Sequence, residues 1–383
     1  MNLTESLRTL TDRLIKIDLV EAKGHLDHPE DLVFLRDIAG ANEALNNIVA
    51  TAKNPNTVTV KWDGYPALIF GRGPNGKFSI MDKHMFNKAG GTGRQVYSPE
   101  DFIKYDAARG VNRGDLSRII TEIWPGLEKA SRGSKGYYWG DLLFSHVLTP
   151  NNNGVYTFKA NPNGITYTVD PNSDLGKLMT NKKAGIAVHQ YLDPAALTTD
   201  DAQTLNGTIG KLRNNSDVAI IPSAMPTIPK LKADTKLVKK TKDDIAKYGA
   251  AIQQLMTTAP QARNTFNGLF TTFINQRIRN GDLKNLYSEF MKYFDTRPMT
   301  AVMKQKLINH IKQNKEGLVG AFTVWIDLYN LKQTLVHQLN KAAESSPVQG
   351  YLQDGTSSQE GFVANGLKYV DRLGFSRQNL QGR

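Results

Sequence analysis

The sequence predicts an α+β fold in which a domain built on an antiparallel sheet is interrupted by a large all-α segment. Three observations support this prediction. Short stretches of strand-forming residues, bounded by glycine, proline and asparagine, recur between residues 57 and 191. Residues 230–344 instead carry apolar side chains every three or four positions, as amphipathic helices do. Strand-like residues return at 360–370, so the helical segment is an insertion in a discontinuous domain.

Composition and charge exclude several classes of protein. The 383 residues include no cysteine, which excludes disulfides, thiolate nucleophiles and cysteine-based zinc sites. The N-terminus lacks the apolar run of a signal peptide, and no stretch approaches the roughly 18 apolar residues that span a membrane. We therefore expect a cytoplasmic protein that does not bind membranes. Its net charge of +12 indicates a polyanionic partner.

The chain begins with an expected amphipathic helix over residues 4–19. Its apolar stripe is Leu7, Leu10, Leu14 and Ile17. His25 and His28 follow, among three carboxylates in residues 27–31. These side chains allow a metal cluster, but a turn in which a proline opens the next helix explains the same residues.

Residues 57–64 are the strand on which the functional argument depends. Side chains alternate along a strand, so its apolar residues face the core while Lys61 and Asp63 share the opposite face. The apolar residues are Val58, Val60 and Trp62. Gly64 then lets the backbone turn or lets a ligand approach closely. A lysine fixed beside a carboxylate is a candidate nucleophile, although a strand running into a turn contains the same residues.

A hairpin is expected directly after this strand. Residues 67–72 form one strand, 73–76 a turn, and 77–86 an antiparallel partner that carries Lys83. The glycine-rich residues 90–94 form a phosphate-compatible loop but lack the spacing of a P-loop.

Structural helices and further strands come next. Ser98 is a capping residue at a helix start, and residues 119–127 belong to a second helix. The strand 136–144 is apolar on both faces apart from Asp141, and a carboxylate there needs a cation, a metal or a bound hydroxyl. Residues 155–169 form another hairpin.

The strand 185–191 ends in two rings that are able to stack on a base, His189 and Tyr191, although a packed strand end explains both. A polar, proline-punctuated boundary follows, with one apolar island at residues 218–221.

The inserted segment is strongly basic. Residues 230–344 contain 19 Lys and Arg against 9 Asp and Glu, a net charge of +10. Six lysines gather at its start: Lys230, Lys232, Lys236, Lys239, Lys240 and Lys242. Four or five helices with apolar stripes then form a bundle, and their aromatic residues are expected in its core rather than on a base-stacking surface. Four of the six lysines, Lys236, Lys239, Lys240 and Lys242, are expected to bind nucleic acid, the alternative being a solvated basic face.

Four of these sequence elements resemble motifs of a known superfamily. Lys61-Trp62-Asp63-Gly64, the acidic strand at Asp141, Glu360-Gly361-Phe362-Val363 and Lys368 resemble motifs I, III, IV and V of the covalent nucleotidyltransferases. That superfamily contains ATP-dependent DNA and RNA ligases and mRNA capping guanylyltransferases. Residues 60–70 and 82–88 more particularly resemble ligase-like proteins of tailed bacteriophages, which implies a location in the host cytoplasm. The resemblance covers residues 25–192 and 358–377.

The resemblance implies a reaction and a site. Lys61 forms a lysyl-AMP intermediate with ATP, and a divalent cation, Mg2+ or Mn2+, is held through Asp141 or Glu360. AMP passes to a 5′-phosphate, and a neighbouring 3′-hydroxyl seals RNA or a nicked duplex. The nucleotide-binding residues are implied to be Asp63, Gly64, Lys83, Asp141, Glu360 and Lys368. These side chains are expected to converge with Lys61 on one pocket.

The implied domains are a nucleotidyltransferase domain over 1–200 and 345–383, a boundary over 201–229 and a helical insertion over 230–344. The sequence ends 15 residues after Lys368, without room for an OB-fold, which favours an RNA-ligase-like layout. One departure is Val370, where motif V usually has a second lysine, so that contact is either missing or supplied by Arg372.

Two alternatives to an active ligase stay open. A catalytically silent protein with this fold would bind nucleic acid or serve as a phage structural protein. A capping-type guanylyltransferase is the weaker alternative.

Overall fold

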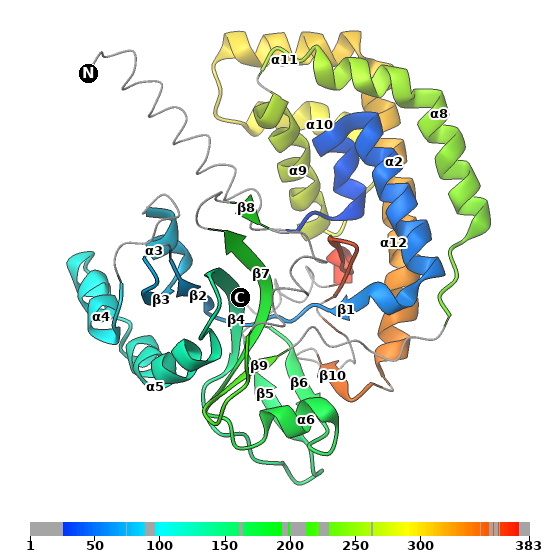
Figure 1. The fold of residues 1–383 in the computed structure, drawn as a ribbon. Coiled ribbons are helices and arrows are strands. Elements are labelled where there is room, and N and C mark those ends of the chain that lie inside the picture. The colour runs from blue at the N-terminus through cyan, green and yellow to red at the C-terminus, as the bar shows by residue number, and fades with distance from the viewer. Residues whose placement is uncertain are drawn as a thin grey trace. The chain divides into compact units, whose positions relative to one another are not determined.

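A computed structural model (Figure 1) describes residues 26–73, 75–88, 96–160, 164–193, 198–199, 212–221, 230–261, 263–344, 346–351, 355, 359 and 361–374. The chain divides into two compact units. Unit 1 contains Met1–Leu26, Val60–Ala224 and Ser346–Gln359, and unit 2 contains Asp27–Thr59, Met225–Ser345 and Glu360–Arg383. Mainly antiparallel sheets and helices make up both, which confirms the mixed α and β composition that the sequence predicts.

The larger sheet of unit 1 carries most of its core. Its strands are β2 (Ala67–Arg72), β3 (Phe78–Met81), β4 (Gly136–Phe144), β7 (Ala184–Asp193), β8 (Thr198–Thr199) and β9 (Val218–Ile221). The first five lie in the order β3-β2-β4-β7-β8 and pair antiparallel, whereas β9 pairs parallel with β7. The apolar island at residues 218–221 is therefore a sheet strand and not part of a boundary region.

Helices pack on this sheet (Figure 1). They are α3 (Lys83–Lys88) and α5 (Gly114–Ala130), and α4 (Pro99–Ala108) packs against α5. Ser98 caps α4 as predicted, because its hydroxyl accepts the Asp101 N–H. The predicted strand 77–86 is wrong beyond Met81: the Asp82 carboxylate accepts the Met85 N–H at 2.6 Å, and this cap starts α3 instead.

A second, three-stranded sheet completes unit 1. Its strands are β5 (Tyr156–Lys159), β6 (Thr166–Val169) and β10 (Val348–Tyr351), beside the short helix α6 (Asp174–Met179). The antiparallel pairing of β5 with β6 confirms the predicted hairpin. Strand β10 adds to β6, so residues far apart in the sequence close this sheet.

Unit 2 is a helical bundle with a small sheet. Its helices are η1 (Pro29–Asp31), α2 (Leu32–Lys53), η2 (Pro55–Thr57), α8 (Thr235–Thr257), α9 (Arg263–Arg279), α10 (Leu286–Tyr293), η3 (Phe294–Thr296), α11 (Ala301–Gln313) and α12 (Lys315–Ala343). The strands β1 (Val58–Val60), β11 (Phe362–Ala364) and β12 (Leu367–Tyr369) form the sheet in the order β1-β11-β12. The chain passes into unit 1 at the end of β1.

Aromatic side chains fill the core of the bundle, as predicted. Phe34 of α2 stacks on Phe270 of α9 at 5.0 Å, and Phe270 stacks on Phe290 of α10 at 4.8 Å. Phe322 of α12 lies 5.9 Å from Phe34. Helix α2 is thus at the centre of the bundle, although the predicted boundaries place it in the first domain.

A buried ion network ties the C-terminal segment to these helices. Lys332 on α12 is fully buried, and its Nζ lies 2.7 Å from the Glu30 carboxylate. Arg372 lies 3.1 Å from Glu30 and 2.8 Å from Asp31, which also accepts the Trp325 indole N–H at 2.9 Å. The predicted boundaries assign residues 345–383 to the first domain, whereas these contacts group residues after Gln359 with the bundle.

Residues 27–31 form the turn that the sequence allowed as one alternative. Pro29 is the first residue of η1, which leads directly into α2. Among the residues the structure describes, no group of three His, Cys, Asp or Glu is placed to hold a metal ion. His25, the helix predicted for residues 4–19 and the loop at 90–94 lie outside the described residues. No helix in the described ranges is long and apolar enough to cross a membrane.

The ion network makes a stability prediction. We expect Lys332→Met to lower the free energy of unfolding by about 3 kcal/mol or more, because removing one partner leaves Glu30 buried without its nearest cation. Chemical denaturation measures the change. Lys239→Met is the control, since Lys239 pairs with Asp243 at the surface and its loss should leave stability nearly unchanged. Equal effects of both substitutions would contradict the prediction.

Candidate functional site

The segment Lys61–Gly64 leaves the end of a short strand. Strand β1 ends at Val60, so the predicted strand 57–64 is shorter than expected and Lys61 and Asp63 follow it. The predicted alternation is nevertheless confirmed, because Trp62 is buried whereas Lys61 and Asp63 are partly exposed. The candidate nucleophile therefore lies at the surface, between buried neighbours.

Tyr167 on β6 anchors this segment from the small sheet. The Asp63 N–H donates a hydrogen bond to the Tyr167 hydroxyl at 2.8 Å. The Tyr167 ring lies 5.0 Å from the Trp62 ring, and Tyr167 itself is fully buried. One tyrosine thus fixes both residues that follow Lys61. Sequence reasoning missed it, because nothing in the local pattern links residues 104 positions apart.

Gly64 brings the segment against β4 at Asp141. A Cβ atom at position 64 would lie 2.6 Å from the Asp141 Cβ and 2.8 Å from the Leu142 carbonyl oxygen. Only glycine permits this approach. The neighbouring Tyr65 N–H donates to the same Leu142 oxygen at 3.1 Å. The structure therefore brings the predicted residues Gly64 and Asp141 into contact and places Asp63 one residue away.

A β-bulge sets the surroundings of Asp141. Gly140 pairs with Val188 but Trp139 pairs with Gln190, so His189 is an extra residue in β7. The His189 Nε2 lies 3.7 Å from the Asp141 carboxylate. The bulge thus directs an imidazole toward the one carboxylate of β4.

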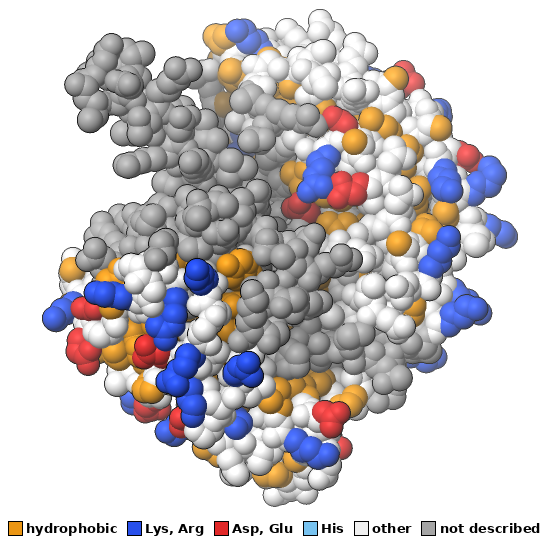
Figure 2. Space-filling view, in the orientation of Figure 1, with side chains coloured by type: hydrophobic (Ala, Val, Ile, Leu, Met, Phe, Trp, Pro, Cys, Tyr) orange, Lys and Arg blue, Asp and Glu red, His pale blue; other side chains and the backbone are white. Residues whose placement is uncertain are grey.

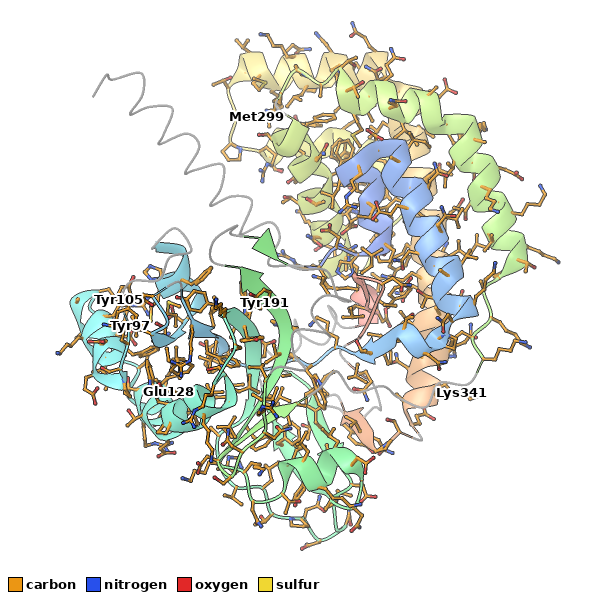
Figure 3. The ribbon with its side chains drawn as sticks, viewed as in Figure 1. Tyr97, Tyr105, Glu128, Tyr191, Met299 and Lys341 are labelled. Carbon is orange, nitrogen blue, oxygen red and sulfur yellow. The ribbon has the colours of Figure 1, made fainter. Side chains whose placement is uncertain are left out.

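The same bulge separates the two predicted stacking rings. Tyr191, labelled in Figure 3, pairs with Tyr138, and the two ring centroids lie 5.5 Å apart. A Cβ on Gly136 would meet the Tyr191 ring, at 2.4 Å from its hydroxyl oxygen, so this ring packs against the sheet. Tyr191 is therefore part of a packed strand end, the alternative that the sequence left open. His189 is the ring that lies beside Asp141.

The prediction that Lys83 lies on a strand is wrong, because this residue begins α3. The structure does not describe its side chain. The start of this helix is held firmly. The Asp82 carboxylate that caps α3 lies 2.8 Å from Arg113 and 3.4 Å from Arg109. Asp106, a second acid, lies 2.7 Å from Arg113.

Of the residues predicted from the C-terminal motifs, the structure describes Lys368, which belongs to unit 2. Lys368 lies on β12, where it pairs with Val363 and its N–H donates to the Asp27 carbonyl oxygen at 2.9 Å. Glu360 lies outside the described residues. The convergence of all these side chains on one pocket therefore stays a prediction.

Arg372 does not have the role that the sequence allowed for it. Its guanidinium is buried and bonds to Glu30, Asp31 and Asn275. The expectation that Arg372 supplies the phosphate contact missing at Val370 is therefore wrong. Its guanidinium already donates hydrogen bonds to Glu30, Asp31 and Asn275 within unit 2.

Four lysines of the cluster, Lys236, Lys239, Lys240 and Lys242, lie on the first turns of α8, which begins after the capping residue Asp234. The Lys239 Nζ lies 2.7 Å from Asp243, and this hydrogen bond raises the pKa of Lys239. Lys240 is 2.8 Å from Asp244 and 2.7 Å from Asp327. Neighbouring carboxylates therefore offset the positive charge of two of the four lysines predicted to bind nucleic acid.

The other two predicted lysines, Lys236 and Lys242, are exposed and make no salt bridge within the described residues. Basic side chains follow the right-hand edge of Figure 2, where α8 lies in Figure 1. Lys242 also borders an open cavity of about 530 Å³ between α2 and α8. Residues lining it include Ile38, Leu45, Ile245 and Gly249.

One family model matches the chain, over residues 23–383, and its description is "Family of unknown function (DUF6267)". Neither the curated proteins nor the solved structures contain a significant match.

The close approach at Gly64 makes a steric prediction. We expect Gly64→Ala to destabilise the protein by about 1–3 kcal/mol, because the added methyl group would overlap Asp141 and the β4 backbone. Thermal or chemical denaturation measures this loss. Gly114→Ala is the matched control, since a Cβ there meets its nearest atom only at 3.7 Å. A Gly64→Ala protein as stable as this control would show that the segment moves freely away from β4.

Proposed function

The chain belongs to DUF6267, a family of unknown function, and we propose that it is an ATP-dependent polynucleotide ligase-like nucleotidyltransferase acting through Lys61. The observation that carries this proposal is the contact of Gly64 with Asp141. Together with the Asp63–Tyr167 hydrogen bond, it fixes the backbone on the C-terminal side of Lys61. A rigidly held lysine beside carboxylates suits covalent catalysis on a phosphate.

In the proposed first step, the lone pair of the neutral Lys61 Nζ forms a bond to the α-phosphorus of ATP. The bond between that phosphorus and the pyrophosphate oxygen breaks, and pyrophosphate leaves with the electron pair. The amine loses a proton as the lysyl-AMP forms. AMP then passes to a 5′-phosphate, and attack by a 3′-hydroxyl seals the strand and releases AMP. RNA is the favoured polynucleotide on the resemblance described above.

The carboxylates near Lys61 fit a magnesium ion. Mg2+ prefers oxygen ligands, keeps several waters, and usually takes one or two carboxylates together with substrate phosphates. Asp141 offers such a carboxylate, and Asp63 lies in the adjoining segment. A bound Mg2+ or Mn2+ would neutralise charge on the α-phosphate and the leaving pyrophosphate. His189, 3.7 Å from Asp141, would have to share or yield that carboxylate.

The remaining site residues enter the proposal through the resemblance alone. They are Lys83, Glu360 and Lys368, the last two in motifs IV and V. A catalytically silent nucleic-acid-binding or phage structural protein is the second candidate. The buried ion network of Arg372 favours this silent candidate. Because Arg372 bonds to Glu30 and Asp31, it does not replace the phosphate-binding lysine that motif V usually has at the position of Val370.

The inserted bundle is proposed to bind the polynucleotide. It holds a net charge of +10 over residues 230–344, and Lys236 and Lys242 present exposed amines on α8. Neutralising phosphates with such side chains releases counterions, which makes binding weaken steeply with salt.

We expect wild-type protein incubated with radiolabelled ATP and Mg2+ to retain label through denaturing electrophoresis. Lys61→Ala should abolish the label, because the phosphoramidate bond can no longer form. Lys159→Ala, which removes an exposed lysine of β5, should label like wild type.

The same assay separates the alternatives. Label from GTP instead of ATP would indicate a capping-type guanylyltransferase. A folded wild-type protein that takes no label from either nucleotide would support the silent candidate. Label that persists in Lys61→Ala would assign the nucleophile to another residue.

We further expect Lys236→Gln with Lys242→Gln to weaken binding to single-stranded RNA and to flatten its salt dependence. The log–log slope should change by roughly 0.7 for each lost phosphate contact. Lys239→Gln with Lys240→Gln is the matched control, and it should have the smaller effect because acids already pair with these lysines. Unchanged binding in both double variants would leave the bundle with another partner.

A further inference from the structure

Tyr65 presents an exposed aromatic ring directly after the Lys61–Gly64 segment. Its residue surface is 64% accessible. The other large hydrophobic side chains of high exposure in the described residues are aliphatic, namely Ile103, Val111, Val147 and Val302. Covering a ring of this size is favourable, so we consider Tyr65 as a contact for a ligand of the adjacent candidate site.

The backbone beneath this ring is fixed on both sides. The Tyr65 N–H donates to the Leu142 carbonyl oxygen at 3.1 Å, and the Leu142 N–H donates to the Pro66 carbonyl oxygen at 3.1 Å. Regular pairing with β4 then begins, with Ala67 opposite Asp141. The ring therefore stands on an immobilised base, and ordering its two side-chain torsions costs little on binding.

The charge around Tyr65 selects among planar ligands. Lys61 precedes it by four residues in the same unit and is partly exposed. A flat ring with cationic side chains that follow a phosphate backbone is the pattern of single-strand binding, in which bases stack on aromatic faces. An uncharged planar ligand would not use the lysine.

We propose that Tyr65 is a stacking platform for an unpaired nucleobase at the end of a single-stranded polynucleotide. This inference rests on the proposed function for its choice of a polynucleotide. The base of a free nucleotide offers the same stacking chemistry, so the experiment includes both sources.

The test uses the full-length protein and a short single-stranded RNA with 2-aminopurine at one end, since stacking on an aromatic ring quenches this base. We expect quenching by wild type and by Tyr65→Phe, which keeps the ring. Tyr65→Ala and Tyr65→Leu should lose the quenching and bind the RNA about 5- to 100-fold more weakly. Val147→Ala, a matched exposed residue of unit 1, should behave as wild type.

Two results would overturn the inference. One is equal quenching by wild type, Tyr65→Ala and Tyr65→Leu, and the other is no quenching by wild type at either end of the RNA. Quenching of 2-aminopurine riboside triphosphate but not of the RNA would overturn the polynucleotide assignment and give the base to a free nucleotide. Parallel ATP labelling separates the hypotheses, because absent label with intact, Tyr65-dependent quenching contradicts only the ligase chemistry.

Discussion

The contact between Gly64 and Asp141 is the constraint on which the candidate site depends. A backbone that approaches a neighbouring strand this closely excludes every side chain at position 64. It leaves Lys61 just after the end of β1, and it joins the segment to β4, a central strand that pairs with both β2 and β7. The small sheet adds a second restraint, because Tyr167 on β6 contacts Trp62 and Asp63. Strand β4 of the larger sheet contacts the next two residues, Gly64 and Tyr65.

Unit 2 depends on a different kind of interaction. Its core is apolar and aromatic, yet two acids and two bases are buried together where η1, α12 and the C-terminal segment meet. Such a network contributes little net stability compared with apolar packing, but it penalises every arrangement that leaves one member unpaired. It therefore specifies where the segment that carries β12 lies within the bundle.

Much of this organisation could be predicted from the sequence, for reasons visible in particular residues. Alternation in Val58, Val60 and Trp62, the Ser98 cap and the aromatic stripe of the bundle are local patterns, and each is confirmed. The strand end at Met81 depended on an Asp82 cap that competes with strand propensity.

The contributions of Tyr167, the His189 bulge and the Arg372 ion network depend on partners far away in the chain. A single sequence does not record such partners. The same is true of α2, because the proline before it predicts a helix start but not the core against which the helix packs.

The division of the chain also constrains how the protein is made. Reading from the N-terminus, the backbone changes unit after Leu26, Thr59, Ala224, Ser345 and Gln359. Unit 1 lacks β10 until residues 348–351 have left the ribosome, and unit 2 lacks β12 and Arg372 until residues 367–372 have followed. Neither unit is therefore a contiguous piece that can be cloned alone. Because contacts between residues so distant in sequence form slowly, we expect the nascent chain to expose unpaired strand edges until these segments are made.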